Sequence, residues 1–102
     1  MVRIVFCNCS PDEASTLARR LVEEKLAACV NVVAGMTSFY RWEGELCEEA
    51  ESVLLIKTTE ERYEAMAEKL TSYHSYDVPE IIGVDSAEVA GPYAEWVHDQ
   101  LR

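Results

Sequence analysis

Two cysteines near the N-terminus have a spacing that could hold a metal. Cys7 and Cys9 lie two positions apart in a β-branched, apolar segment. In a strand, both thiols would lie on one face. Two thiolates joined by the imidazole of His74 would suit Cu(I) or Zn(II). These three residues are the candidate ligands for copper or another divalent cation. We expect no obligatory cofactor. The sequence also allows both cysteines to be buried as small hydrophobic residues.

A second group of side chains that could take part in acid–base chemistry lies around Pro79. Glu80 follows this proline at the start of a predicted strand, and His74 and Tyr76 precede it closely. This trio could perform acid–base chemistry, although structural hydrogen bonds explain it as well. No GxSxG, HExxH, P-loop or GxGxxG pattern accompanies the trio. We therefore do not expect an enzyme.

Acidic residues gather in the middle of the chain. The cluster consists of Glu43, Glu45, Glu48, Glu49 and Glu51. Carboxylate oxygens bind hard cations, so the cluster could hold such an ion. Acidic residues that alternate along a hairpin are also typical of a solvated face. The sequence favours the solvated face over a cation site.

The net charge of the chain excludes some classes of binding partner. Among 102 residues, 9 are Lys or Arg and 19 are Asp or Glu, so the formal net charge is −10. Nucleic acids and anionic membranes select basic surfaces, so we expect neither as a partner. No segment approaches the ~20 consecutive apolar residues of a membrane span, and residues 1–6 do not resemble a signal peptide. These features predict a cytoplasmic protein with free thiols.

The chain reads as a single domain over residues 1–102, with 49% hydrophobic residues to form its core. The predicted elements are a strand over 3–9, a helix from Ser10, strand structure over 28–41, a return strand containing 52–56, a helix from Thr58, a strand over 80–84 and a short helix from Gly91. A bulge or bend is expected at Gly35, and a hairpin turn at 43–45. This order predicts an α+β fold, the ferredoxin-like βαββαβ sandwich with a short C-terminal helix.

The predicted topology brings most candidate residues to one edge of the sheet. The first strand ends where the fourth begins, and the hairpin projects from the same edge. Cys7 and Cys9, segment 74–80 and hairpin residues 42–47 are therefore expected to be neighbours. Lys57 is expected at the opposite end, unless a neighbouring subunit brings it to this edge.

The strands are more apolar than a sheet with one solvated face requires. Apolar residues occupy consecutive positions at 53–56, 81–82 and 29–30. Two helices would cover only one face, so an alternating pattern would be sufficient. We therefore expect a homo-oligomer that packs sheet against sheet. The alternative is that the C-terminal helix covers the second face.

Several segments, which together span nearly the whole chain, resemble the CutA divalent-cation tolerance proteins. The segments are EKLAACVN at 24–31, SFYRWEG at 38–44, IKT at 56–58, HSYDVPEII at 74–82 and YAEW at 93–96. The resemblance implies a tight homotrimer similar to PII signalling proteins. It also implies a role in tolerance of copper and other divalent metals, with copper binding. The alternative is a PII-like regulator that binds a small molecule in a cleft between subunits.

The resemblance also assigns individual residues. His74 matches the histidine that the family associates with metal binding, while Asn8 stands where some relatives have a cysteine. Ser75 replaces a common proline, which implies a less rigid loop before Tyr76. The positions that resemble the intersubunit cleft are Trp42, Glu51, Lys57, Tyr76 and Glu80. Stabilising the trimer is the alternative role for these residues.

Overall fold

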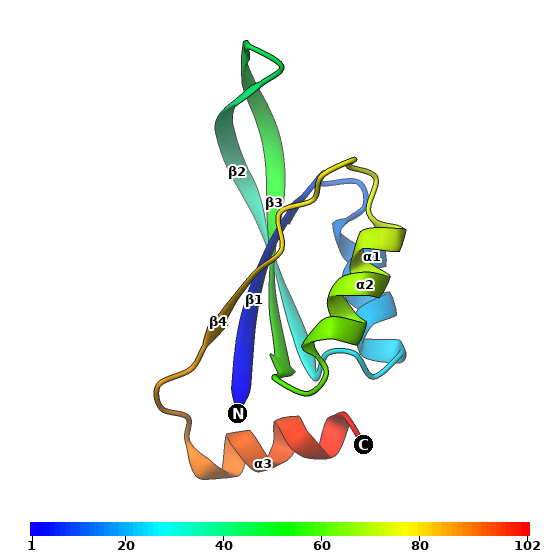
Figure 1. The fold of residues 1–102 in the computed structure, drawn as a ribbon, viewed down its shortest axis with the longest axis vertical. Helices are drawn as coiled ribbons and strands as arrows, with labels where there is room; N and C mark the ends of the chain where they lie inside the picture. The colour runs from blue at the N-terminus through cyan, green and yellow to red at the C-terminus, as the bar shows by residue number, and fades with distance from the viewer.

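The computed structural model describes residues 1–102 as a four-stranded antiparallel sheet with three helices (Figure 1). The elements are β1 (Val2–Cys9), α1 (Ala14–Glu23), β2 (Cys29–Trp42), β3 (Glu45–Thr59), α2 (Tyr63–Tyr73), β4 (Ile82–Asp85) and α3 (Gly91–Gln100). The strand order is β2-β3-β1-β4. This arrangement confirms the predicted βαββαβ order with its terminal helix. None of the helices has both the length and the apolar character needed to cross a membrane.

The two helix starts differ from the predicted positions. Helix α1 begins at Ala14 and follows a turn over residues 10–13, in which the Glu13 N–H donates to the Ser10 carbonyl at 3.2 Å. The Ser10 N–H donates to the Glu13 carboxylate at 3.2 Å, as in a capping box. Strand β3 continues through Thr59, so the predicted helix start at Thr58 is wrong and α2 begins at Tyr63. The Thr59 hydroxyl still accepts a hydrogen bond from the Arg62 N–H at 3.3 Å, as the side chain of a helix-capping residue does.

Strands β2 and β3 continue well beyond the rest of the sheet as a projecting hairpin (Figure 1). Strand β1 pairs with β3 only from Ser52 to Thr59, so residues 36–51 form a two-stranded arm. A register shift between Val33 and Met36 contains Gly35, whose φ is 79°. The turn at the tip has positive φ at Glu43 and Gly44. The predicted bulge and turn are both confirmed.

The main core lies between the sheet and the helices α1 and α2. It contains Val5, Cys7, Cys9, Leu54 and Ile56 from the strands and Leu17, Leu21, Met66 and Leu70 from the helices. Since side chains alternate along a strand, Phe6 and its partner Ile82 lie on the opposite face. They expose 39% and 53% of their surface. Helix α3 packs only at one end of the molecule, where Val97 and Leu101 contact Val2 and Ala28. Much of the second face is therefore uncovered in the single chain.

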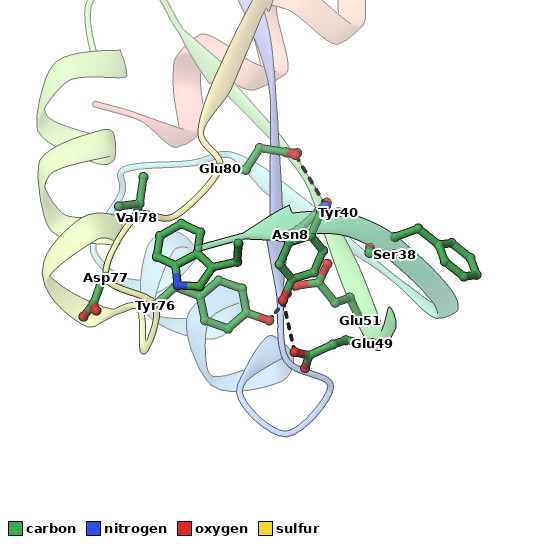
Figure 2. A pocket seen from close by; sticks show the side chains of 11 residues that line it. Asn8, Ser38, Tyr40, Glu49, Glu51, Tyr76, Asp77, Val78 and Glu80 are labelled. Atoms are coloured by element: carbon green, nitrogen blue, oxygen red, sulfur yellow. Dashed lines mark hydrogen bonds between the residues drawn. The ribbon is translucent and has the colours of Figure 1, made fainter. Parts of the chain in front are cut away.

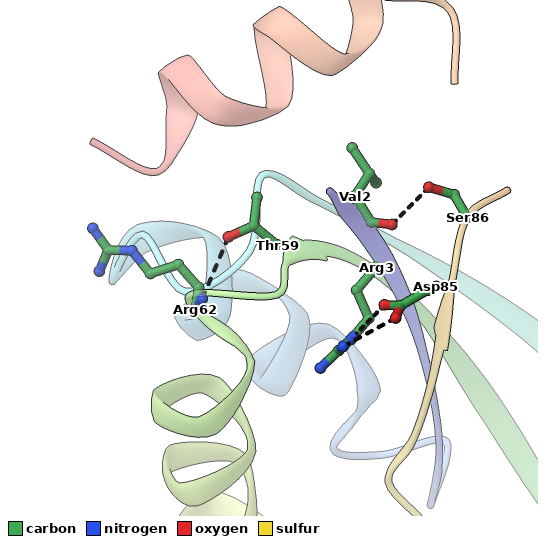
Figure 3. A network of polar contacts seen from close by, with 6 residues as sticks. All are labelled: Val2, Arg3, Thr59, Arg62, Asp85 and Ser86. Carbon is green, nitrogen blue, oxygen red and sulfur yellow. Dashed lines mark hydrogen bonds and ion pairs between the residues drawn. The ribbon is translucent and has the colours of Figure 1, made fainter. Parts of the chain in front are cut away.

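A polar network attaches β4 to the first strand (Figure 3). The Arg3 Nε donates to Asp85 Oδ1 at 2.6 Å, and the Ser86 hydroxyl donates to the Val2 carbonyl at 2.7 Å. Strand β4 has only four residues, so these contacts add to a short ladder of backbone hydrogen bonds. These contacts anchor one end of the segment over residues 80–86, and Glu80 lies at its other end.

Candidate functional site

A cavity of about 640 Å³ lies where the projecting hairpin leaves the sheet (Figure 2). The end of β1, the hairpin and the loop between α2 and β4 form its walls. The lining residues are Asn8, Ser38, Phe39, Tyr40, Trp42, Glu49, Glu51, Tyr76, Asp77, Val78 and Glu80. We refer to this cavity as the acidic pocket, because four of its side chains are carboxylates and none is Lys, Arg or His.

Strand alternation explains which hairpin residues reach the acidic pocket. Glu49 and Glu51 lie two positions apart on β3, so they are on the same face of the arm. Glu51 is the last residue before β3 pairs with β1, which explains why it is 5% exposed although the preceding residues 48–50 of the arm are exposed. On β1, Asn8 lies on the opposite face from Cys7 and Cys9. Its side chain therefore faces the pocket instead of the core.

Hydrogen bonds hold three of the pocket's carboxylates in place. The Tyr76 hydroxyl donates to Glu51 Oε2 at 2.6 Å, and the Tyr40 hydroxyl donates to Glu49 Oε1 at 3.0 Å. The Asn8 amide Nδ2 donates to Glu80 Oε1 at 3.4 Å. Each donor is a neutral group. The pocket thus orients its negative charges without neutralising them.

The concentration of carboxylates changes the ionisation of the site. The pKa of Glu80 is raised above its ordinary value of 4.5, first by burial and then by the negative charge of Glu51. The pKa of the Tyr76 hydroxyl is also raised, by burial and by its hydrogen bond to Glu51. Both shifts favour the protonated forms of these groups. A bound positive charge would act in the opposite direction.

The structure places the predicted thiol ligands outside this pocket. Cys7 and Cys9 have no exposed surface and belong to the core beneath α1 and α2. Burial, with the charge of Cys9 as the next contribution, raises the pKa of Cys7 to about 12. Burial, followed by the charge of Glu13, raises the pKa of Cys9 to about 11. Metals bind thiolates, so these shifts oppose ligation.

His74 is also engaged in structural contacts. Its Nδ1 accepts the Tyr76 N–H at 3.1 Å, so the ring proton is on Nε2, which lies 2.8 Å from the Asn8 carbonyl oxygen. No group of three or more His, Cys, Asp or Glu side chains is close enough to hold a metal ion. The structure therefore does not bring Cys7, Cys9 and His74 together as a ligand set.

Four of the five residues assigned to the cleft by resemblance line the acidic pocket: Trp42, Glu51, Tyr76 and Glu80. Lys57 does not, because it pairs with Cys29 and Ile4 far along β3 and donates to Asn31. The rings of His74 and Tyr76 lie 4.6 Å apart, but no hydrogen bond joins the side chains of the proposed acid–base trio, since the Tyr76 hydroxyl donates to Glu51 and the His74 ring bonds to backbone groups.

Asp77 belongs to segment 74–80, which was expected at this edge, whereas no sequence pattern assigned Asn8, Tyr40 and Glu49 to the pocket. For Glu49, strand alternation with Glu51 was an available signal. The others reach the pocket through contacts between distant segments, such as Asn8 with Glu80 across 72 positions. Of the acidic cluster at 43–51, two members line the pocket. Glu43, Glu45 and Glu48 are exposed.

Comparisons with known proteins agree with the fold and the matched segments. The family model described as CutA1 divalent ion tolerance protein matches residues 3–100. The divalent-cation tolerance protein CutA of Thermus thermophilus is 46% identical over 90 residues, which are 88% of this chain and 87% of that protein. None of these names describes an enzyme.

Solved structures show the same likeness in three dimensions. The divalent cation tolerance protein Cut A1 from Thermus thermophilus has a TM-score of 0.93 and 42% identity, and the match covers 98% of each chain. The PII-like protein CutA from Nostoc sp. PCC 7120 has a TM-score of 0.93 and 30% identity, with 98% of this chain and 97% of that chain covered.

Proposed function

The chain belongs to the CutA1 divalent ion tolerance family, and from this premise we propose that it acts by binding a hydrated divalent cation in the acidic pocket. The observation that carries the proposal is the buried carboxylate of Glu51, which is 5% exposed. It has no ion-pair partner, because the three salt bridges of the chain involve other residues. A buried charge without a counter-charge is costly, and a bound cation would remove that cost.

The chemistry of the pocket suits hard cations better than soft ones. Carboxylate and amide oxygens are preferred ligands of Mg²⁺-like ions, which keep several of their waters. Glu51, Glu80 and the amide oxygen of Asn8 would hold such a hydrated ion through its bound waters, with no direct chelation by several carboxylates. Copper at Cys7 and Cys9 has no comparable support, because those thiols are buried in the core.

The proposed functional form is a homotrimer in the cytoplasm. The uncovered apolar face around Phe6 and Ile82 supports an oligomer that buries it. Light scattering is expected to give three times the 11.5 kDa mass of one chain. A mass of one chain at micromolar concentration would contradict the trimer.

Calorimetric titration with Mn²⁺ tests the cation site. We expect Glu51→Gln and Glu80→Gln to weaken binding at least tenfold, because each removes one negative charge that attracts the hydrated ion. Glu48→Gln is the matched control, since Glu48 is an exposed hairpin residue outside the pocket. Equal affinities for all four proteins, or no binding by the wild type, would contradict the proposal. Light scattering on each variant confirms that its assembly is unchanged.

A second candidate is a PII-like regulator that binds a small molecule in the same place. The size of the cavity favours it, because about 640 Å³ is within the range of small-molecule sites. The aromatic side chains in its lining also fit an organic ligand better than a metal ion alone.

A further inference from the structure

We propose that the acidic pocket binds an organic dication, a linear alkyl diammonium ion, between its carboxylates and its aromatic side chains. The proposal rests on the proposed function in one respect, namely that the pocket is a cation site. It differs in the class of ligand, since it concerns an amine instead of a metal. Charge, aromatic surface and the spacing of the carboxylates each contribute to it.

The charge of the pocket excludes an anionic ligand. Glu49, Glu51, Asp77 and Glu80 line it without any basic residue. The Tyr76 hydroxyl donates to Oε2 of Glu51, and no protein group donates to Oε1, which remains accessible to solvent. An ammonium group would supply both the missing donor and the missing positive charge. A phosphate or carboxylate ligand would instead be repelled.

The aromatic residues supply a surface that a bare metal ion would not use. Trp42 and Phe39 expose 47% and 64% of their surface, and Tyr40 and Tyr76 also line the pocket. Aromatic faces attract ammonium groups through their quadrupole, with Trp the strongest of the three types. Their faces also cover the alkyl chain of an organic cation. Exposed aromatic side chains beside carboxylates are therefore a combination that suits an amine.

The carboxylates are spread across the pocket, which favours a ligand with two charges. Figure 2 shows Glu80 on one side and Glu49 and Glu51 on the other, with the Tyr40 ring between them and the Tyr76 ring to the left, its hydroxyl pointing toward Glu51. No three acidic, histidine or cysteine side chains are close enough to chelate one ion. A flexible molecule with an ammonium group at each end would reach both sides. The cavity of about 640 Å³ has room for such a chain.

Titration with 1,4-diaminobutane at constant ionic strength tests the proposal directly. The chain has two tryptophans, and Trp96 lies on α3 against Tyr93. In a Trp96→Phe background, fluorescence therefore reports on Trp42 alone. We expect a saturable change with the diamine and none with the neutral 1,4-butanediol or the anionic succinate. The assembled protein is used throughout, and calorimetry gives the affinities.

Matched variants separate this proposal from the alternatives. By calorimetry, Trp42→Leu and Glu49→Gln are each expected to lower the affinity for the diamine at least tenfold. Glu48→Gln is expected to leave this affinity unchanged. Binding of Mn²⁺ without binding of the diamine would overturn this inference and leave the metal proposal standing. Binding of the diamine without Mn²⁺ would support this inference and contradict the metal site.

A lysine from a second copy of the chain is the remaining possible occupant. Lys57 is the candidate, because the resemblance places it in the intersubunit cleft although it is far from the pocket of its own chain. If the diamine binds only when Lys57→Met is introduced, the natural occupant is the lysine and the inference is overturned. Equal diamine binding by the wild type and Lys57→Met supports an external amine.

Discussion

The hydroxyl of Ser75 donates a 2.6 Å hydrogen bond to the carboxylate of Glu13, which joins the loop before β4 to the turn before α1. The Ser75 N–H donates to the same carboxylate at 3.1 Å, and Ser10 donates to it through both its N–H and its hydroxyl. The resemblance implied a less rigid loop, because Ser75 replaces a proline. These bonds provide a different restraint on the loop that carries Tyr76.

We expect Glu13→Gln to destabilise the protein by about 1 kcal/mol at pH 7, because a hydrogen bond to a charged carboxylate is stronger than one to a neutral amide. Burial tends to raise the pKa of Glu13, but the hydrogen bonds from Ser75 and Ser10 outweigh it and lower the pKa below 4.5. The stabilisation is therefore present above the unfolded pKa and is lost as the pH falls through the folded one. Urea unfolding of both proteins at pH 7 and pH 3 checks this. A difference that persists unchanged at pH 3 would contradict it.

Glu80 is expected to show the opposite pH dependence. Burial and the charge of Glu51 raise its pKa above 4.5, so the folded state holds the proton more tightly than the unfolded state. Its contribution is then favourable at low pH and is lost as the pH rises through the folded pKa. With EDTA present, Glu80→Gln should be more stable than the wild type at pH 7 and similar to it at pH 4. A variant that is less stable at pH 7 would show that the Asn8 contact dominates.

The cysteines should fall into two reactivity classes. Cys7 and Cys9 are fully buried, whereas Cys29 and Cys47 are partly exposed. At most two of the four thiols are expected to react with a disulfide reagent in the folded protein, and all four in denaturant. Mass spectrometry identifies the modified residues. Native labelling of Cys7 as fast as that of Cys47 would reopen the thiol metal site.

The bulge in β2 should depend on its glycine. Gly35 has a φ of 79°, so an alanine there meets no steric neighbour but adopts a left-handed backbone. We expect Gly35→Ala to cost about 1 kcal/mol in urea unfolding at fixed protein concentration. Gly91→Ala is the control, because Gly91 is equally open without the positive φ. Similar costs for both changes would show that backbone conformation is not the cause.

Local sequence signals predicted the elements, because such signals act within a few residues. Alternation in β1, Pro92 at the start of α3 and the glycines at 35 and 44 all describe the backbone close to themselves. The family-specific segments also indicated the protein family to which the chain belongs. The start of α2 was predicted too early, because pairing of β3 with β1 extends the strand through Thr59. Long-range pairing outweighed the local capping signal there.

Which side chains meet was decided by the tertiary structure. Strand alternation predicts that Cys7 and Cys9 share a face, but only the packing of α1 and α2 makes that face the core and gives Asn8 to the pocket. Likewise, Tyr76 reaches Glu51 across 25 positions because the hairpin and the loop before β4 meet at one edge. A pocket depends on contacts between segments that are far apart in the chain. Its charge and shape therefore emerge only when those segments pack together.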